Sequence, residues 1–144
     1  MTVQIEIVEH VTPELADAFA RLVPQLSRSA AVPDNEALTR LISSDAITVL
    51  VARSGPDVAG SLTLVMFPLP TGTRAWIEDV VVDESARGQG IGEALTVRAL
   101  ELARQAGART VDLTSRPSRA AAGRLYERVG FQLRDSRLYR YSLD

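Results

Sequence analysis

The 144-residue sequence has no cysteine, no lysine and a single histidine. Without cysteine, thiol nucleophiles, cysteine zinc sites and disulfide frameworks are excluded. Without lysine, a Walker-type phosphate loop is excluded, because its signature ends in Gly-Lys followed by Ser or Thr. The lone His10 is interpreted as a surface residue, and the acids show no ligand spacing, so the sequence predicts no metal site.

Long apolar runs, aromatic side chains and dense basic runs are also scarce. The apolar runs are only a few residues long, which predicts no membrane span. Aromatic residues make up 5% of the chain, too few to suggest stacking on bases, so no nucleic-acid partner is predicted. Residues 1–10 lack the basic and apolar regions of a secretory signal, so a cytoplasmic location is expected. The length suits one domain, residues 1–144.

The charge is small overall but uneven along the chain. The net charge is −2, and all sixteen basic residues are arginine. Residues 1–86 have a balance of −7, and residues 87–144 a balance of +5. Charge counts alone favour a solvated surface. The alternative is that the second half holds a polyanionic ligand while the first half shapes a site for a cation.

The hydrophobic pattern predicts the element order β-α-α-β-β-β-α-β-α-β-β and a mixed sheet. Helices are expected from the cap Thr12 to Val23, where Pro24 ends the helix, after Asp34, from Ile91 to Gly107, and from near Ser118 to Gly130. Strands are expected at residues 4–8, 47–53, 58–67, 74–82, 110–114, 131–133 and 138–143. The stretch from residue 74 to residue 114 then forms one β-α-β unit.

The informative segment is Val80-Val81-Val82-Asp83-Glu84-Ser85-Ala86-Arg87-Gly88-Gln89-Gly90-Ile91-Gly92. It combines a strand, a loop with three alternate glycines and a helix start, where free amides and the helix dipole favour a phosphate. A dinucleotide fold fits poorly, since Glu93 stands where a third glycine is needed and five residues separate Val82 from Gly88. A plain turn and cap accounts for one glycine but not three.

Arg87-x-x-Gly90-x-Gly92 after a valine-rich strand resembles the pyrophosphate signature of GNAT (GCN5-related) N-acetyltransferases. Residues 118–131, which contain Leu-Tyr-Glu followed by Gly-Phe, are similar to the family's second cofactor segment. The resemblance implies an α/β (α+β) fold, the GNAT acyl-CoA N-acyltransferase fold. Its mixed sheet would have six to seven strands, about four flanking helices and a splayed central strand pair.

The resemblance also implies acetyl-CoA as co-substrate and no metal. The pantetheine arm would lie along Val80, Val81 and Val82, between this strand and residues 110–114. The remaining cofactor contacts would come from the pyrophosphate loop with Glu93 at its edge and from the last helix, namely Arg87, Gly88, Gln89, Gly90, Ile91, Gly92, Glu93, Ser118, Arg119 and Tyr126. Many relatives have Asn where this chain has Arg119, which in its place would reach a phosphate.

Two side chains are candidates for catalysis. An amine attacks the thioester only when it is unprotonated, and its free pKa is near ~10, so a base is needed. Glu78 would face the substrate cleft and act through water or bind the amine; the alternative is a structural pair with an arginine. Strand alternation would put Glu78, Val80 and Val82 on one face. The resemblance implies that Tyr126 protonates the CoA thiolate, whereas spacing alone indicates a core aromatic. The amide of Val80 would stabilise the oxyanion.

Three classes of function stay open. The leading hypothesis is an enzyme that acetylates a primary amine of a small cationic metabolite in a ternary complex. Relatives that act on peptide amino termini often carry Glu where this chain has Thr114, which weakens that assignment. The alternatives are an inactive acyl-CoA-binding sensor and an interaction module. A homodimer is expected by family analogy.

Overall fold

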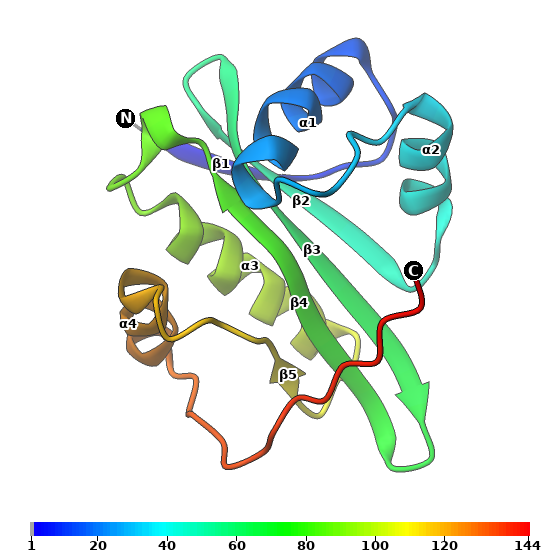
Figure 1. Cartoon of the computed structure of the whole chain (residues 1–144), viewed down its shortest axis with the longest axis vertical. Coiled ribbons are helices and arrows are strands. Elements are labelled where there is room, and N and C mark those ends of the chain that lie inside the picture. Colours follow the sequence, from blue (N-terminus) through cyan, green and yellow to red (C-terminus); the bar gives the residue numbers. More distant parts are fainter. Residues whose placement is uncertain (1) are drawn as a thin grey trace. The chain divides into compact units, whose positions relative to one another are not determined.

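The computed structural model describes residues 2–144 as two compact units, one ending at Thr114 and one comprising Ser115–Asp144 (Figure 1). The first unit holds the sheet and three α-helices, and the second holds the last α-helix. That residues 1–144 form a single domain stays a prediction.

The first unit is built on a five-stranded mixed sheet, as the predicted fold class requires. Its strands follow the chain order and are β1 (Val3–Ile7), β2 (Ile47–Ser54), β3 (Asp57–Leu69), β4 (Gly72–Val82) and β5 (Val111–Asp112). The first four strands pair antiparallel, and β5 pairs parallel to β4. Because β5 returns through a helix, the predicted β-α-β unit is confirmed.

The first two helices begin where the sequence predicts, at the cap Thr12 and directly after Asp34. The hydroxyl of Thr12 accepts a hydrogen bond from the amide of Leu15 at 3.1 Å, which starts α1 (Pro13–Leu26). A carboxylate oxygen of Asp34 accepts from the amide of Ala37 at 2.8 Å, which starts α2 (Asn35–Ser43). Both side chains satisfy amides that have no partner inside the helix.

The prediction that Pro24 ends α1 is wrong, because the helix continues through Pro24 to Leu26. A proline in the last turn removes only one backbone hydrogen bond. The extra residues are tied down by their side chains: Leu26 packs against the hydrophobic core, and Gln25 accepts a hydrogen bond from the amide of Glu84.

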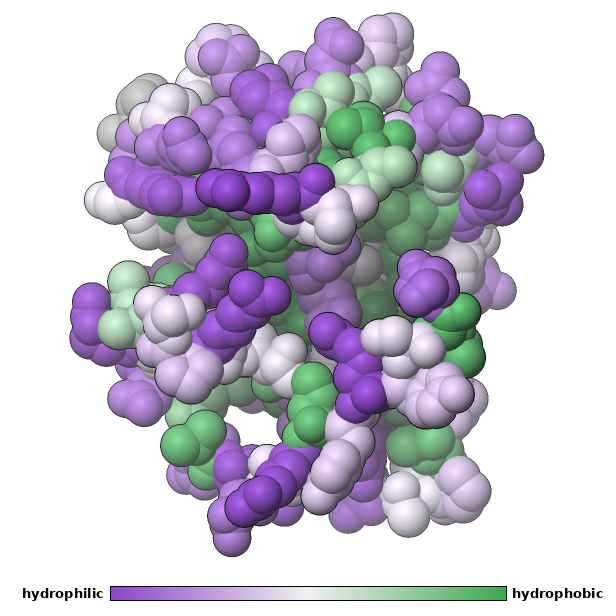
Figure 2. Space-filling view, in the orientation of Figure 1, coloured by the Kyte–Doolittle hydropathy of each residue, from purple (hydrophilic) through white to green (hydrophobic). Residues whose placement is uncertain are grey.

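One face of the sheet is covered by α1 and α2. Side chains of α1 and of the sheet form one hydrophobic cluster, and Ile42 of α2 packs against it. The cluster consists of Leu15, Ala18, Leu22, Val51, Val58 and Val81. In the upper part of Figure 2, over α1 and α2, hydrophilic side chains form most of the outer surface and apolar ones show between the helices. The core therefore lies beneath an amphipathic pair of helices.

The opposite face carries α3 (Ile91–Gln105), which packs closely on β3. A Cβ added at Gly60 would lie 2.9 Å from the carbonyl oxygen of Val81 and 3.0 Å from the side chain of Ile91, so a larger residue here would clash with β4 and press on α3. Gly107, with φ +80°, follows the end of α3 as predicted.

The second unit contains α4 (Ala120–Val129), which ends at Gly130 as predicted. The two closing strands predicted at residues 131–133 and 138–143 are wrong, because no strand occurs among the described residues of this unit. The sheet accordingly has five strands rather than six to seven. Alternating apolar residues indicate a strand only where one face is buried, whereas Leu133 and Leu143 are 97% and 93% exposed.

Candidate active site

A glycine loop, defined here as residues 83–90, connects the end of β4 to the start of α3. It begins with a short 3-10 turn (Glu84–Ala86) and contains Gly88 and Gly90 with φ of +81° and +78°. Gly90 occupies the cap position of α3, and no side chain caps this helix. A Cβ added at Gly88 or Gly90 would meet nothing within 4 Å. The start of α3 thus presents amide groups and the positive end of the helix dipole to open space, which suits a phosphate.

The other predicted side chains of this loop have different surroundings. Arg87 and Gln89 are exposed, and Glu93 is half-buried on the first turn of α3. Ile91 is 1% exposed, so its side chain belongs to the core and only its main chain can serve a ligand. Gly92 is the second residue of α3, and its carbonyl oxygen accepts a hydrogen bond from the buried Thr96 hydroxyl at 2.7 Å.

β4 and β5 separate immediately after their pairing begins. They are in register only at Ala75 with Val111 and at Trp76 with Asp112, whereas β4 continues to Val82. The β5 side of residues 77–82 therefore has no strand partner within the described chain. This is the splayed strand pair that the sequence resemblance implied, and it leaves the main chain of Val80 to Val82, which leads into the glycine loop, without a strand partner on that side.

A β-bulge in β4 changes which side chains share a face. Asp79 has φ +52°, and the register passes from Thr63 with Glu78 to Ser61 with Val81, so two residues of β4 stand opposite Leu62. The prediction that Glu78, Val80 and Val82 share a face is wrong. Val81 instead lies on the face of Glu78, where it joins the α1 cluster.

Glu78 stands at this bulge with an exposed side chain. Its Oε1 accepts a hydrogen bond from the indole nitrogen of Trp76 at 3.0 Å. Trp76 lies two residues earlier on the same face of β4, so the bond fixes the carboxylate along the strand. The arginine pair offered as the structural alternative is not among the ion pairs of the described residues.

Tyr126 lies on α4 in the second unit, half-buried, with Leu125 and Val129 also half-buried. Its ring contacts that of Phe131 edge-on, with centroids 5.8 Å apart. Burial raises the pKa of the Tyr126 hydroxyl above its ordinary value, and the positive charge of Arg119 lowers it in part. A phenol with a raised pKa stays protonated at neutral pH and can act as an acid.

Ser118 and Arg119 precede α4 in the same unit. Ser118 is exposed in a turn, and Arg119 occupies the cap position with no side-chain cap bond. The helix begins at Ala120, two residues after Ser118. The predicted site residues thus fall into two groups: the β4 and glycine-loop residues in the first unit, and Ser118, Arg119 and Tyr126 in the second.

Two further features bear on the predicted chemistry. Among residues 2–144, no group of three metal-ligating side chains comes together. None of the helices described is long and apolar enough to cross a membrane.

Sequence reasoning missed several residues that hold the glycine loop in place. Arg21 and Gln25 of α1 bond to residues 83 and 84, and Ser54 bonds to Gln89. Gly60 allows α3 to approach β3. A glycine inside an apolar strand was a usable signal for Gly60. The others make contacts across long sequence separations, for which one sequence gives no signal.

Comparisons with known proteins point to one family. The model of the acetyltransferase (GNAT) family matches residues 13–131. The chain is 38% identical over 74 residues to N-alpha-acetyltransferase 30 of Schizosaccharomyces pombe, covering 51% of this chain and 49% of that protein. It is 38% identical over 84 residues to glucosamine 6-phosphate N-acetyltransferase of Trypanosoma brucei brucei, covering 56% and 55%. The chain therefore spans about half the length of these curated relatives.

A solved structure shows the same fold. An aminoglycoside acetyltransferase from an uncultured soil metagenomic sample superposes with a TM-score of 0.87 over 99% of this chain and 97% of that one, at 21% identity. The family model spans both units and includes the glycine loop and α4. With that match, the chain belongs to the acetyltransferase (GNAT) family.

Proposed function

We propose that this protein is an N-acetyltransferase that transfers an acetyl group from acetyl-CoA to a primary amine by direct attack in a ternary complex. The observation that carries the proposal is the glycine loop, which leads from the end of β4, unpaired on its β5 side, into the uncapped start of α3. Amides at the start of α3 would hold a pyrophosphate, and the free edge of β4 would accept an extended, amide-containing arm. Family members use acetyl-CoA, and the residues present suit it.

A small cationic amine is the proposed acceptor. Glu78 and Asp79 are both exposed at the bulge of β4, and their carboxylates favour a positively charged ligand. A peptide amino terminus is the second candidate, supported by the similarity to N-alpha-acetyltransferase 30. Both acceptors present the same group, so the chemistry proposed at Glu78 is common to them.

Glu78 would receive the proton that the amine must lose. A free alkylamine has a pKa near ~10, so at neutral pH nearly all of it carries a proton that blocks attack. The carboxylate is held by the Trp76 indole through one oxygen, which leaves the other for the amine or a bridging water. Whether it contacts the amine directly or through a water, the Glu78 carboxylate would bind the protonated amine and accept its proton as the amine attacks the thioester.

Val80 and Tyr126 would serve the remaining steps. The bulge leaves Asp79 and Val80 outside the β3 register, so the Val80 amide is a candidate donor to the developing oxyanion. The Tyr126 hydroxyl, kept protonated by its raised pKa, would give a proton to the departing thiolate. Ser118 and Arg119 would assist by contacting the phosphates.

The first experiment is thermal unfolding with acetyl-CoA, with NADH and ATP as controls. A ligand at 100 times its Kd stabilises the folded state by about 2.7 kcal/mol, which raises the Tm by several degrees. A shift with acetyl-CoA alone supports the proposal, and no shift at saturating concentration contradicts it. Amines, aminosugars and peptides with free amino termini are then screened by release of CoA thiol. Amine-dependent release excludes the non-catalytic sensor.

We also propose a cytoplasmic location and, by family analogy, a homodimer. Sedimentation velocity tests the second: a species of twice the 15.6 kDa chain mass supports it.

A further inference from the structure

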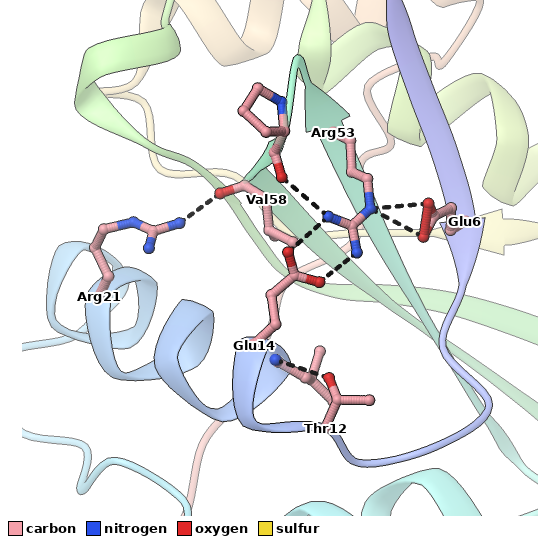
Figure 3. Close-up of polar contacts among 8 residues, drawn as sticks. Glu6, Thr12, Glu14, Arg21, Arg53 and Val58 are labelled. Carbon is pink, nitrogen blue, oxygen red and sulfur yellow. Dashed lines mark hydrogen bonds and ion pairs between the residues drawn. The ribbon is translucent and has the colours of Figure 1, made fainter.

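The glycine loop is fastened to α1 by side chains that have no part in the proposed chemistry. The Nε of Arg21 donates to Oδ2 of Asp83 at 2.8 Å, and its Nη2 donates to the carbonyl of Val58. Figure 3 shows Arg21 reaching from α1 to the beginning of β3. One guanidinium therefore links α1 to β3 and to the residue at which the loop begins.

The next residues of the loop are held in the same way. The side-chain oxygen of Gln25 accepts a hydrogen bond from the amide of Glu84 at 3.0 Å, and Oδ1 of Asp83 accepts from the amide of Ser85 at 3.2 Å. Burial would raise the pKa of Asp83, but hydrogen bonds from Ser85, Arg21 and Gln25 outweigh it and lower the pKa. Asp83 therefore stays charged at neutral pH and keeps its bond to Arg21.

The far end of the loop is tied to the β2–β3 hairpin. The hydroxyl of Ser54 donates to Oε1 of Gln89 at 3.0 Å, directly before the capping Gly90. The hairpin is itself fixed by Arg53, which bonds to Glu6 of β1, Glu14 of α1 and the carbonyl of Pro56 (Figure 3). The hydrogen bonds of Arg53 thus fix the backbone next to Ser54.

These bonds cross an open hollow. Its volume is about 400 Å³, and its lining includes Arg21, Ser54, Asp57, Asp83, Ser85 and Gln89. Ala86, which is 6% exposed, is the buried residue of this side of the loop, whereas Ser85 and Gln89 are exposed. Hydrogen bonds at the two ends, together with the buried Ala86, therefore hold a loop that contains two left-handed glycines.

We infer that Arg21 and Ser54 are positioning residues for acetyl-CoA, which act through Asp83 and Gln89 to keep the loop amides aimed at the pyrophosphate. The inference rests on the proposed function. Amides bind an anion well only when they are held in the bound arrangement beforehand, since ordering a mobile loop on binding reduces affinity. Neither side chain would touch the reacting atoms, so their loss would weaken cofactor binding and leave the chemical step intact.

The test compares Arg21→Met with Arg40→Met. Both changes remove an arginine that pairs with an acid on the first unit, but the pair of Arg40 with Glu36 lies on the exposed side of α2, away from the glycine loop. We expect Arg21→Met to raise the Kd and the KM for acetyl-CoA about tenfold, as for loss of a hydrogen bond to a charged group, with kcat within about twofold. Arg40→Met should leave both constants unchanged. Arg21→Lys keeps the charge for Asp83 and should restore most of the affinity.

A second pair of variants tests the other end of the loop. Ser54→Ala should raise the Kd for acetyl-CoA about threefold to fivefold, whereas Ser43→Ala, which removes a hydroxyl bonded within α2, should not. These variants carry the test if Arg21→Met does not fold. Wild-type protein that fails to bind acetyl-CoA refutes the proposed function. Wild-type protein that binds, with Arg21→Met and Ser54→Ala binding equally well or with kcat falling as far as affinity, refutes this inference alone.

Discussion

Replacing Gly90 with alanine separates the cost of a strained backbone from the cost of a blocked site. Gly90 has φ +78°, and an added Cβ would meet no protein atom within 4 Å. The fold therefore loses only the left-handed strain of a residue with a side chain, about 1–2 kcal/mol. For a chain of this length that corresponds to a fall in Tm of roughly 3–8 °C.

Binding should suffer more than folding. The methyl group of Gly90→Ala would project into the open space over the start of α3, where the phosphate must approach the main chain. We expect the Kd for acetyl-CoA to rise tenfold or more, about 1.4 kcal/mol for each factor of ten. Isothermal titration calorimetry below the Tm of the variant measures this change directly.

Gly107→Ala is the matched control. Gly107 has φ +80° and equally open surroundings, but it lies beyond the other end of α3. Gly107→Ala should lower the Tm by about as much as Gly90→Ala does and leave the Kd for acetyl-CoA unchanged. If the two variants weaken binding equally, or if Gly90→Ala binds as wild type does, then the glycine loop is not the phosphate site.

Three further outcomes follow from the site. Tyr126→Phe should lower kcat by about 10²-fold and leave the Kd for acetyl-CoA unchanged. It should also abolish any fall in rate above pH ~10, because the raised pKa keeps the native hydroxyl protonated at lower pH. An unchanged kcat would show that Tyr126 serves only in packing. Glu78→Gln should lower kcat/KM for the amine by about 10²-fold, with recovery as pH approaches ~10 and free amine accumulates; a pH-independent defect would contradict a role in deprotonation. Asp83 has a lowered folded-state pKa, so its stabilising effect is present above its ordinary pKa near ~3.9 and is lost as pH falls through the folded value. Denaturation in urea should accordingly show Asp83→Asn less stable than wild type at pH 7, with the difference shrinking as the pH falls below ~3.9.

Much of the fold was predictable because its signals are local. The caps Thr12 and Asp34, the hairpin after Ser54 and the left-handed Gly107 each act within a few residues, and the structure has them where the sequence predicts them. The predictions are wrong where contacts between distant parts of the chain determine where an element ends or whether it forms. Pro24 is kept inside α1 by what Leu26 and Gln25 contact elsewhere, and the alternating tail forms no strand because nothing buries one of its faces.

The site was predictable to a different degree. The phosphate site was predictable because Gly88 and Gly90 directly precede a helix and Gly92 lies in its first turn, a pattern visible in the sequence alone. The bulge at Asp79 could not, because an aspartate in a strand gives no sign of its positive φ until the β3 register is known. Arg21 looks like any surface arginine in α1, and only the fold brings it to Asp83.

Arg53 also bears on the rate at which the protein unfolds. Its guanidinium joins segments separated by 47 and 39 residues along the chain, so its bonds to Glu6 and Glu14 form only after β1, α1 and the hairpin have assembled. We expect contacts of this kind to be largely absent from the folding transition state. Their loss would therefore accelerate unfolding and leave the folding rate almost unchanged, which makes this arginine a determinant of the lifetime of the native state.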